Sequence, residues 1–435
     1  MTTPADAPGP APGRLIRQFS TTVVDQVVLS GANFIVGFLL IRHTNDLDYG
    51  MYVLVQSAIT LLISAQMAFL SSPLAVVAPG KPPALRRLMI GAVDSSQRRF
   101  LRRAALLAML LPLAGYLLHH WSGFEAAVIA FAIIACWTAL QREYLRGVLL
   151  IYARAHSMLR ADLIGVAVLI VGALAAAYGP RPAIFLAIGA LSVSALAAEA
   201  GARKSLNEDP GLQSGDAAPF WREMRPLALW ATVGAMTYWI YNQSYNYVLA
   251  SRINLTAVAD VNAVRLLLMP TIALTVGVKT LLVPTAARWL AGSTIGRLIR
   301  RLLLFATAIA ALDVGYCALV WVFRNWLSHD MMHKNIGNRD LLLILWAILS
   351  LIALYRDLLQ TGLFALRQFK SLAGVTAVSA VVSLSIMWLG IKTWGAAAAL
   401  IGQVAGETVN LLGVVLLLAF AYHQARDTAK AKPTH

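Results

Sequence analysis

Charged residues are scarce in this chain. Asp, Glu, Lys and Arg make up 13% of its 435 residues, whereas 59% are hydrophobic. The mean hydropathy of +0.69 excludes an ordinary water-soluble domain. Cysteine is almost absent too: the only two, Cys136 and Cys317, fall in apolar runs, where they are expected to pack as small apolar side chains. Two isolated cysteines exclude a metal site built on clustered thiolates, so we expect neither a metal nor a cofactor.

Long apolar runs are abundant instead. A helix needs about 20 apolar residues to cross a bilayer, and about twelve segments approach that length. In lipid, only helices and closed barrels satisfy the backbone, and these runs are too long and continuous for barrel strands. The sequence therefore predicts an all-α polytopic membrane protein, with spans at 20–41, 52–78, 103–119, 123–141, 159–178, 182–199, 227–250, 264–286, 302–323, 341–361, 371–391 and 395–421.

A net charge of +16 would suit a nucleic-acid-binding protein, but the distribution of the basic residues argues against one. Most of them fall between alternate spans, on the side that also holds both termini. The other side has only Arg42, Arg181, Arg252, Arg324, Lys334, Arg339 and Lys392. This asymmetry is typical of a multi-pass protein of the bacterial inner membrane with both termini in the cytoplasm. The Pro/Ala/Gly-rich segment 1–19 is expected to be a disordered cytoplasmic tail without a signal peptide.

The chain contains a weak internal repeat. Arg42 ends the first span as Arg252 ends the seventh, and Arg142-Glu143 corresponds to Arg356-Asp357 at nearly the same offset. Six spans per half make the repeat parallel, and transporters built this way hold substrate near the midplane between the halves. We therefore expect two pseudo-symmetric six-helix lobes around a central cavity. The expected parts are an N-lobe, a flexible cytoplasmic linker, a C-lobe and a cytoplasmic tail, at 20–199, 200–226, 227–421 and 422–435.

The first span and the loop after it, LSGANFIVGFLLIRHTNDLDYGMYVLV, resemble the start of polysaccharide flippases of the multidrug/oligosaccharidyl-lipid/polysaccharide (MOP) exporter superfamily. The residues that carry the resemblance are Gly31, Asn33, Phe34, Arg42, Asp48, Tyr49, Gly50 and Tyr52. The resemblance implies a non-enzymatic flippase. It would move an undecaprenyl-diphosphate-linked oligosaccharide from the inner to the outer leaflet for surface polysaccharide synthesis, beside a polymerase and chain-length machinery. The chain lacks the two extra helices usual in lipid II flippases.

Cations inside the spans suit a diphosphate headgroup, because Arg forks onto phosphate oxygens and Lys offers a point charge. Arg265 and Lys279 are fourteen residues apart in one predicted span, so they should share a helix face about 21 Å apart. There they would pass a headgroup across, with Pro270 as a kink between them. The alternative is that both side chains snorkel to opposite interfaces.

Two further groups of charges belong to the repeat. Arg142 and Arg146 are one helical turn apart and could grip one anion together, while Glu143 points elsewhere. The alternative is an ion pair at the inner interface. Arg356-Asp357 lies deeper, and because neighbours on a helix do not face each other, each should find a partner on another helix.

Other polar residues have weaker signals. Arg42 and Arg252 are either interface anchors or headgroup-release sites at the outer mouth. Carboxylates in or near spans can carry a proton, or can simply pack between helices. They include Asp162 and Asp313, and our candidates for ion coupling are Glu407, Asp357, Glu143 and Asp25.

The seventh span is aromatic and polar. Tyr238, Tyr241 and Tyr245 share a helix face that would stack on sugar rings, with Asn242 beside them. An interfacial aromatic belt would explain only the outer end of this segment.

Other function classes compete with the flippase. A multidrug or small-molecule exporter of the same superfamily would prefer an acidic lining for its cationic substrates. For a membrane glycosyltransferase, Asp46 and Asp48 would supply the pair of acidic residues. Their loop, however, is too short to form an acceptor site. A non-transporting scaffold in a glycan assembly complex is a further alternative.

Overall fold

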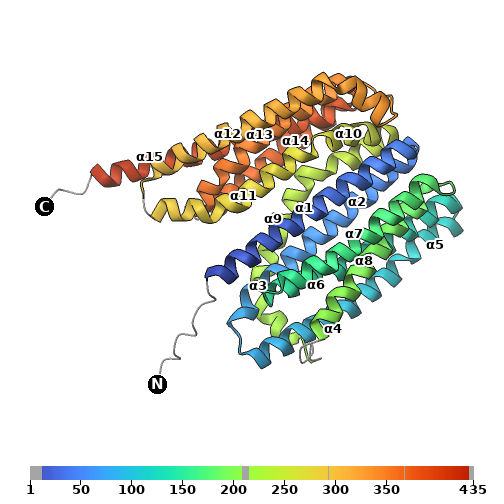
Figure 1. Ribbon diagram of the computed structural model, residues 1–435, viewed down its shortest axis with the longest axis horizontal. Coiled ribbons are helices and arrows are strands. Elements are labelled where there is room, and N and C mark those ends of the chain that lie inside the picture. Colours follow the sequence, from blue (N-terminus) through green and yellow to red (C-terminus); the bar gives the residue numbers. More distant parts are fainter. Residues whose placement is uncertain (1–11, 208–214, 292, 367, 431–435) are drawn as a thin grey trace. The chain divides into compact units, whose positions relative to one another are not determined.

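The structure, a computed structural model, describes residues 12–207, 215–291, 293–366 and 368–430. A few helical side chains, including that of Tyr238, lie outside the described part. The regular structure of these residues is helical throughout (Figure 1).

The helices follow one another with short connections. Those of the first half are α1 (Pro12–His43), α2 (Asp46–Gln66), α3 (Ser72–Val77), α4 (Pro83–Ala108), α5 (Leu110–Leu117), α6 (Gly123–Ile151), α7 (Ala155–Tyr178) and α8 (Ala183–Asn207). Those of the second half are α9 (Ala218–Arg252), α10 (Leu255–Leu267), α11 (Met269–Ala291), α12 (Ile295–Val322), α13 (Arg339–Ala365), α14 (Phe369–Trp394) and α15 (Ala397–Lys430).

The apolar runs of the sequence became membrane-length helices. Among the described residues, ten spans are long and apolar enough to cross a bilayer, or eleven if the bent pair α10 and α11 counts as one. The sequence predicted about twelve; α9 is one continuous helix but is not among the ten. The all-α polytopic fold class is confirmed.

The ends of several predicted segments differ from the structure. Residues 12–19 of the expected disordered tail have a helical backbone in α1, and α15 continues through residue 430 of the expected C-terminal tail. The expected linker 200–226 is helical up to Asn207 and again from Ala218. Helix formation needs no apolar side chains, so a helix can continue past the membrane edge that hydropathy detects. Residues 1–11, 208–214 and 431–435 lie outside the described part.

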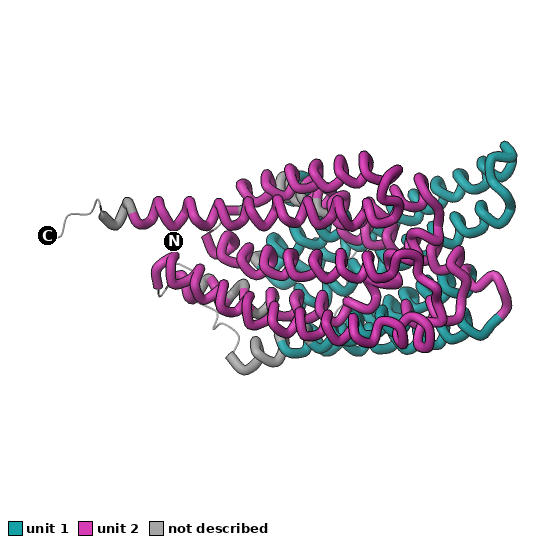
Figure 2. The backbone as a smooth tube through the Cα atoms, turned by 90° about the horizontal axis from the view of Figure 1, so that it is seen from above, with its two compact units in different colours: residues 1–36, 65–179, 185–231 teal, residues 37–64, 180–184, 232–435 magenta. Residues whose placement is uncertain are grey.

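Contacts divide the chain into two compact units, coloured in Figure 2. One comprises 1–36, 65–179 and 185–231, the other 37–64, 180–184 and 232–435. The boundaries cut through α1, α2, α8 and α9 rather than falling at mid-chain. The lobes 20–199 and 227–421 therefore stay a prediction.

Unit 1 has its core where α4, α6 and the segment around α3 meet. Met89, Ile90 and Val93 of α4 pack with Leu145 and Val148 of α6, all fully buried. The Tyr144 hydroxyl donates to the Ile90 carbonyl at 3.0 Å. α6 begins with a capping box, in which Ser122 and Glu125 satisfy each other's backbone N–H groups. This fixes the start of the helix that carries the charges of unit 1.

Unit 2 is built around α11, α12, α13 and α15. Leu298 and Leu302 of α12 are buried against Leu358 and Leu363 of α13 and Val414 of α15. α14 packs on α15 through glycines. A Cβ at Gly406 would lie 2.7 Å from Ser383 Cβ and 2.9 Å from the Ser379 carbonyl oxygen, so α15 can approach α14 this closely only without a side chain there.

Candidate functional site

Arg142 and Arg146 of α6 converge on one carboxylate in unit 1. Nη2 and Nε of Arg142 lie 2.5 and 3.1 Å from Asp162 Oδ1, and Nε of Arg146 lies 2.8 Å from Asp162 Oδ2. Asp162 comes from α7 and is fully buried. Here the two arginines hold a carboxylate of the chain itself, and their expected role in gripping a substrate anion stays a prediction. We call this pair the twin-arginine clamp.

The clamp belongs to a larger charge cluster. Arg146 also contacts Asp25 of α1 at 2.6 Å and Glu143 at 3.3 Å. Glu143 was expected to point away from the arginines. That expectation is wrong, because residues three apart on a helix are neighbours. Three carboxylates therefore surround two guanidinium groups, which leaves the cluster with an excess of one acid if all are ionised.

Unit 2 has a second cluster, centred on Arg356 of α13. Arg356 forks onto Glu407 of α15, with Nε and Nη2 each 3.0 Å from one carboxylate oxygen. Lys279 of α11 bonds Asp357. As predicted, each member of the Arg356-Asp357 pair has a partner on another helix. Arg356 Nη1 also lies 2.9 Å from Asp357 Oδ1, so the expectation that the adjacent pair would not meet is wrong. The long guanidinium side chain folds back along the helix.

Arg265 and Lys279 do not share a helix face. The predicted single span 264–286 is broken at Leu268, where α10 and α11 meet at a bend of 59°. Pro270 is the physical cause, because its ring nitrogen cannot donate to the Leu266 carbonyl and its ring crowds the preceding turn. Arg265 therefore lies in the last turn of α10, on the other side of the bend from Lys279. There its Nη1 lies 3.4 Å from the Tyr245 hydroxyl, and its Cζ 5.8 Å from the centre of the Trp346 ring.

The tyrosine face of α9 is packed. Tyr241 and Tyr245 are each 1% exposed. The Tyr241 carbonyl accepts from Gln403 at 2.5 Å, and the Tyr245 hydroxyl donates to Asn262 at 3.3 Å. Asn242 is half-buried beside them, and the side chain of Tyr238 lies outside the described part. These rings present no open stacking face in this conformation, so a glycan-lining role stays a prediction that requires the helices to part.

A polar seam beside the tyrosines was missed at the sequence level. Asn246 of α9 is fully buried; it donates to Ser57 of α2 at 3.0 Å and accepts from Asn262 of α10 at 2.7 Å. Polar residues inside apolar spans were the available signal, but the sequence does not say which of them meet.

Arg42 lies in the last turn of α1, and Arg252 is the last residue of α9. The Arg252 guanidinium stacks on the Trp388 ring at 3.9 Å, as an interface anchor would. Their two proposed roles remain open.

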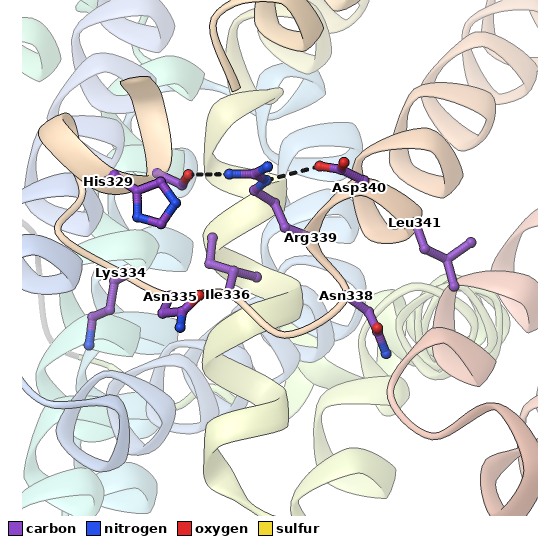
Figure 3. Close-up of a pocket in the computed structure, with 9 residues that line it drawn as sticks. His329, Lys334, Asn335, Ile336, Asn338, Arg339, Asp340 and Leu341 are labelled. Atoms are coloured by element: carbon purple, nitrogen blue, oxygen red, sulfur yellow. Dashed lines mark hydrogen bonds and ion pairs between the residues drawn. The ribbon is translucent and has the colours of Figure 1, made fainter. Parts of the chain in front are cut away.

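A polar pocket of about 360 Å³ lies in unit 2 where the segment after α12 turns into α13 (Figure 3). Arg339 bonds Asp340 and Ser328, at 3.0 and 2.6 Å, and His329 lines the wall. Lys334 reaches across to the Asp46 carboxylate and, at 3.1 Å, to the Thr44 carbonyl at the α1–α2 turn. The basic side chains that line this pocket, Arg339 and Lys334, are bonded to acceptors of the chain itself, as in the two clusters.

No protein-family profile matches the sequence, and no curated protein is similar to it in sequence. Solved structures are similar. An inward-facing multidrug resistance MATE transporter of the MOP superfamily has a TM-score of 0.72 at 12% identity, over 94% of this chain and 96% of that one. The lipid II flippase MurJ, inward closed, has 0.74 at 10%, over 93% and 87%. A point mutant of the Vibrio cholerae MATE transporter VcmN has 0.65 at 13%, over 95% and 97%.

The chain has the MOP transporter fold. It is a multi-pass membrane protein, and the proteins it resembles in structure are transporters and a flippase rather than enzymes. At sequence identities this low, the similarity shows a shared fold only. The MOP superfamily contains both multidrug and lipid-linked carriers, so the fold leaves the substrate to be argued from the charges.

Proposed function

We propose that this chain flips a diphosphate-linked oligosaccharide lipid, such as an undecaprenyl-diphosphate glycan, from the inner to the outer leaflet of a bacterial cytoplasmic membrane. The observation that carries the proposal is the twin-arginine clamp, in which three guanidinium N–H groups converge on Asp162 inside a membrane-length helix. Intramembrane arginines are expensive to keep and mark substrate pathways.

A phosphate group fits what the clamp now holds. Guanidinium forks bind carboxylate and phosphate oxygens with the same planar geometry, and a diphosphate offers more charge and more acceptors than Asp162. In the empty carrier Asp162 contacts both arginines, and Asp25 and Glu143 supply further negative charge at Arg146. When the headgroup arrives, it takes over these donors, so the site is built for an anion that competes with an internal carboxylate.

Unit 2 contains candidate substrate contacts of its own. Arg356 and Lys279 offer a further pair of cations, and Arg265 offers another in the last turn of α10. Tyr241 and Tyr245 would contact the sugars once α9 parts from its neighbours. Arg42 and Arg252 would then contact the headgroup as it is released at the outer side. Alternating access moves the headgroup while the lipid tail stays in the bilayer.

Exchange of partners also supplies a coupling rule. When a substrate anion binds a guanidinium, the carboxylate that was paired with this guanidinium becomes an unpaired charge. An unpaired charge within the membrane is energetically costly. Asp25, Glu143, Asp357 and Glu407 would then take up a proton or a monovalent cation. A glycan polymerase with its chain-length machinery would use the product on the outer leaflet.

One observation favours a second candidate, a multidrug exporter. The unit 1 cluster has three carboxylates against two arginines, and the spare charge could attract an organic cation. Against it, each of these carboxylates already contacts a guanidinium, which would repel a cationic drug.

The two candidates are separated by lipid analysis of cells that lack the protein. The flippase proposal predicts that a completed polyprenyl-diphosphate glycan accumulates on the inner leaflet, and that wild-type protein relieves this but Arg146→Ala does not. Unchanged glycan lipids together with increased sensitivity to cationic drugs would contradict the flippase proposal and support the exporter.

A further inference from the structure

One carboxylate deep in the membrane-length helices stands apart from the two charge clusters. Asp313 of α12 lies near the middle of the apolar stretch 302–323, about 15 Å from either end, and is 1% exposed. In the described part of the chain no Lys or Arg contacts it. Asp25, Glu143, Asp162, Asp357 and Glu407 all contact one. An ionised Asp313 would therefore be a lone charge at bilayer depth.

The partners of Asp313 cannot neutralise it. Ser350 Oγ lies 3.1 Å from Asp313 Oδ2, Cys317 Sγ lies 4.0 Å from Oδ1, and the Thr271 hydroxyl also faces the carboxyl. Each hydroxyl has only one proton, and each also has a backbone acceptor: Ala347 at 2.9 Å for Ser350 and Leu268 at 2.9 Å for Thr271. If the hydroxyl groups donate to these carbonyls, they can only accept from Asp313. Asp313 must then be protonated to form hydrogen bonds with them.

The surroundings also favour the neutral acid. Asp313 borders a groove of about 330 Å³ whose other walls are apolar, among them Leu268, Val314, Trp321 and Leu351. Burying an unpaired carboxylate among such side chains is far more expensive than burying a hydrogen-bonded acid. The titratable neighbours are Cys317 and Tyr316 of α12 itself, and the Tyr316 hydroxyl is used by the Leu267 carbonyl at 2.8 Å. Arg356 of α13 and Glu407 of α15 pair with each other.

The groove opens on the break between α10 and α11. The Leu267 carbonyl accepts from the Tyr316 hydroxyl, and the Leu268 carbonyl accepts from the Thr271 hydroxyl in addition to the backbone N–H groups of Thr271 and Ile272, at 3.2 and 3.3 Å. Discontinuous membrane helices whose broken ends meet a polar side chain are recurrent cation sites in transporters. Here the broken ends and the lone carboxyl share Thr271.

We propose that Asp313, with Thr271 and Ser350, forms a proton-binding site beside the bend between α10 and α11. With the proton bound, Asp313 donates to a hydroxyl oxygen, and the hydroxyl groups of Thr271 and Ser350 donate to the carbonyls of Leu268 and Ala347. When the proton leaves to water, the carboxylate draws the hydroxyl protons of Thr271 and Ser350 to itself. The Leu268 carbonyl then keeps only its two backbone donors, the N–H groups of Thr271 and Ile272 at 3.2 and 3.3 Å, so the hydrogen bonding at the bend changes. The link to transport rests on the function proposed above, whereas the proton binding does not.

The test is infrared difference spectroscopy of the purified full-length protein in lipid, over a pH titration. The proposal predicts a carboxylic-acid C=O band that persists at neutral pH, disappears in Asp313→Asn and is kept in Glu125→Gln, a carboxyl at the exposed start of α6. Ser350→Ala should shift this band, since it removes a hydrogen-bond partner. That shift keeps the proposal testable if Asp313→Asn folds poorly.

Two results would overturn the proposal. The first is a neutral-pH acid band that is unchanged in both Asp313→Asn and Ser350→Ala. The second is a sodium-induced change in tryptophan fluorescence that needs Asp313, with no acid band, which would make the site a sodium site instead. If the band behaves as expected but the protein moves no glycan lipid, proton binding stands and the flippase proposal alone fails.

Discussion

The salt bridge between Arg356 and Glu407 allows the sharpest stability prediction. Its side chains are only 6% and 3% exposed, and both Glu407 oxygens accept from Arg356 at 3.0 Å. Arg356→Met would leave Glu407 with no guanidinium partner in the described part of the chain. Removing one member of a buried pair costs about 3–5 kcal/mol of unfolding free energy.

The reverse change should cost less. Glu407→Gln leaves Arg356 with Asp357 at 2.9 Å, so its charge remains paired. The double variant Arg356→Met/Glu407→Leu removes both charges, and such replacements are often neutral or stabilising by about 1–4 kcal/mol. We therefore expect the order of stability to be double variant and wild type first, then Glu407→Gln, then Arg356→Met.

The assay is equilibrium unfolding of the purified full chain in detergent, with the four proteins compared as a double-mutant cycle. A loss in Arg356→Met below about 1 kcal/mol, the range of an exposed pair, would refute the argument that the pair is buried and dry. A double variant as unstable as Arg356→Met would refute it as well.

Three further predictions concern the clamp, the seam and the α14–α15 contact. Arg146→Lys keeps the charge but loses the fork, so glycan-lipid transport in reconstituted vesicles should fall about tenfold, the effect of one lost charge-assisted hydrogen bond; unchanged transport would contradict the clamp. Asn246→Leu leaves the buried Asn262 amide without its 2.7 Å partner, and thermal unfolding should show a loss of about 1–3 kcal/mol; a neutral effect would mean that water fills the seam. Gly406→Ala should destabilise by about 1–3 kcal/mol because its Cβ meets Ser383, whereas the control Gly374→Ala on α14, with nothing within 4 Å, should not; equal stability of the two would contradict the close approach.

The sequence predicted the features that depend on local pattern. Membrane-length helices follow from apolar runs, and a spacing of one turn places Arg142 and Arg146 on one side of α6, where both contact Asp162. Contacts between distant residues did not follow: Arg146 meets Asp25 across 121 residues of chain, and no periodicity encodes that meeting.

The break at Leu268 lies between these cases. Pro270 signalled a kink, but a proline bends a helix by an amount that the surrounding packing decides, so the separation of Arg265 from Lys279 needed the structure. Asp313 was visible as a carboxylate in a span. That no Lys or Arg of the described residues contacts it could be known only from the structure.

Reconstitution tests the central claim most directly. Vesicles that contain the full chain would receive a fluorescent polyprenyl-diphosphate oligosaccharide in one leaflet, and its arrival in the other would be followed by a membrane-impermeant quencher. The account predicts movement that wild-type protein supports and that is lost in Arg146→Ala but kept in Glu125→Gln. Movement no faster than in empty vesicles, while the same vesicles transport an organic cation, would contradict it.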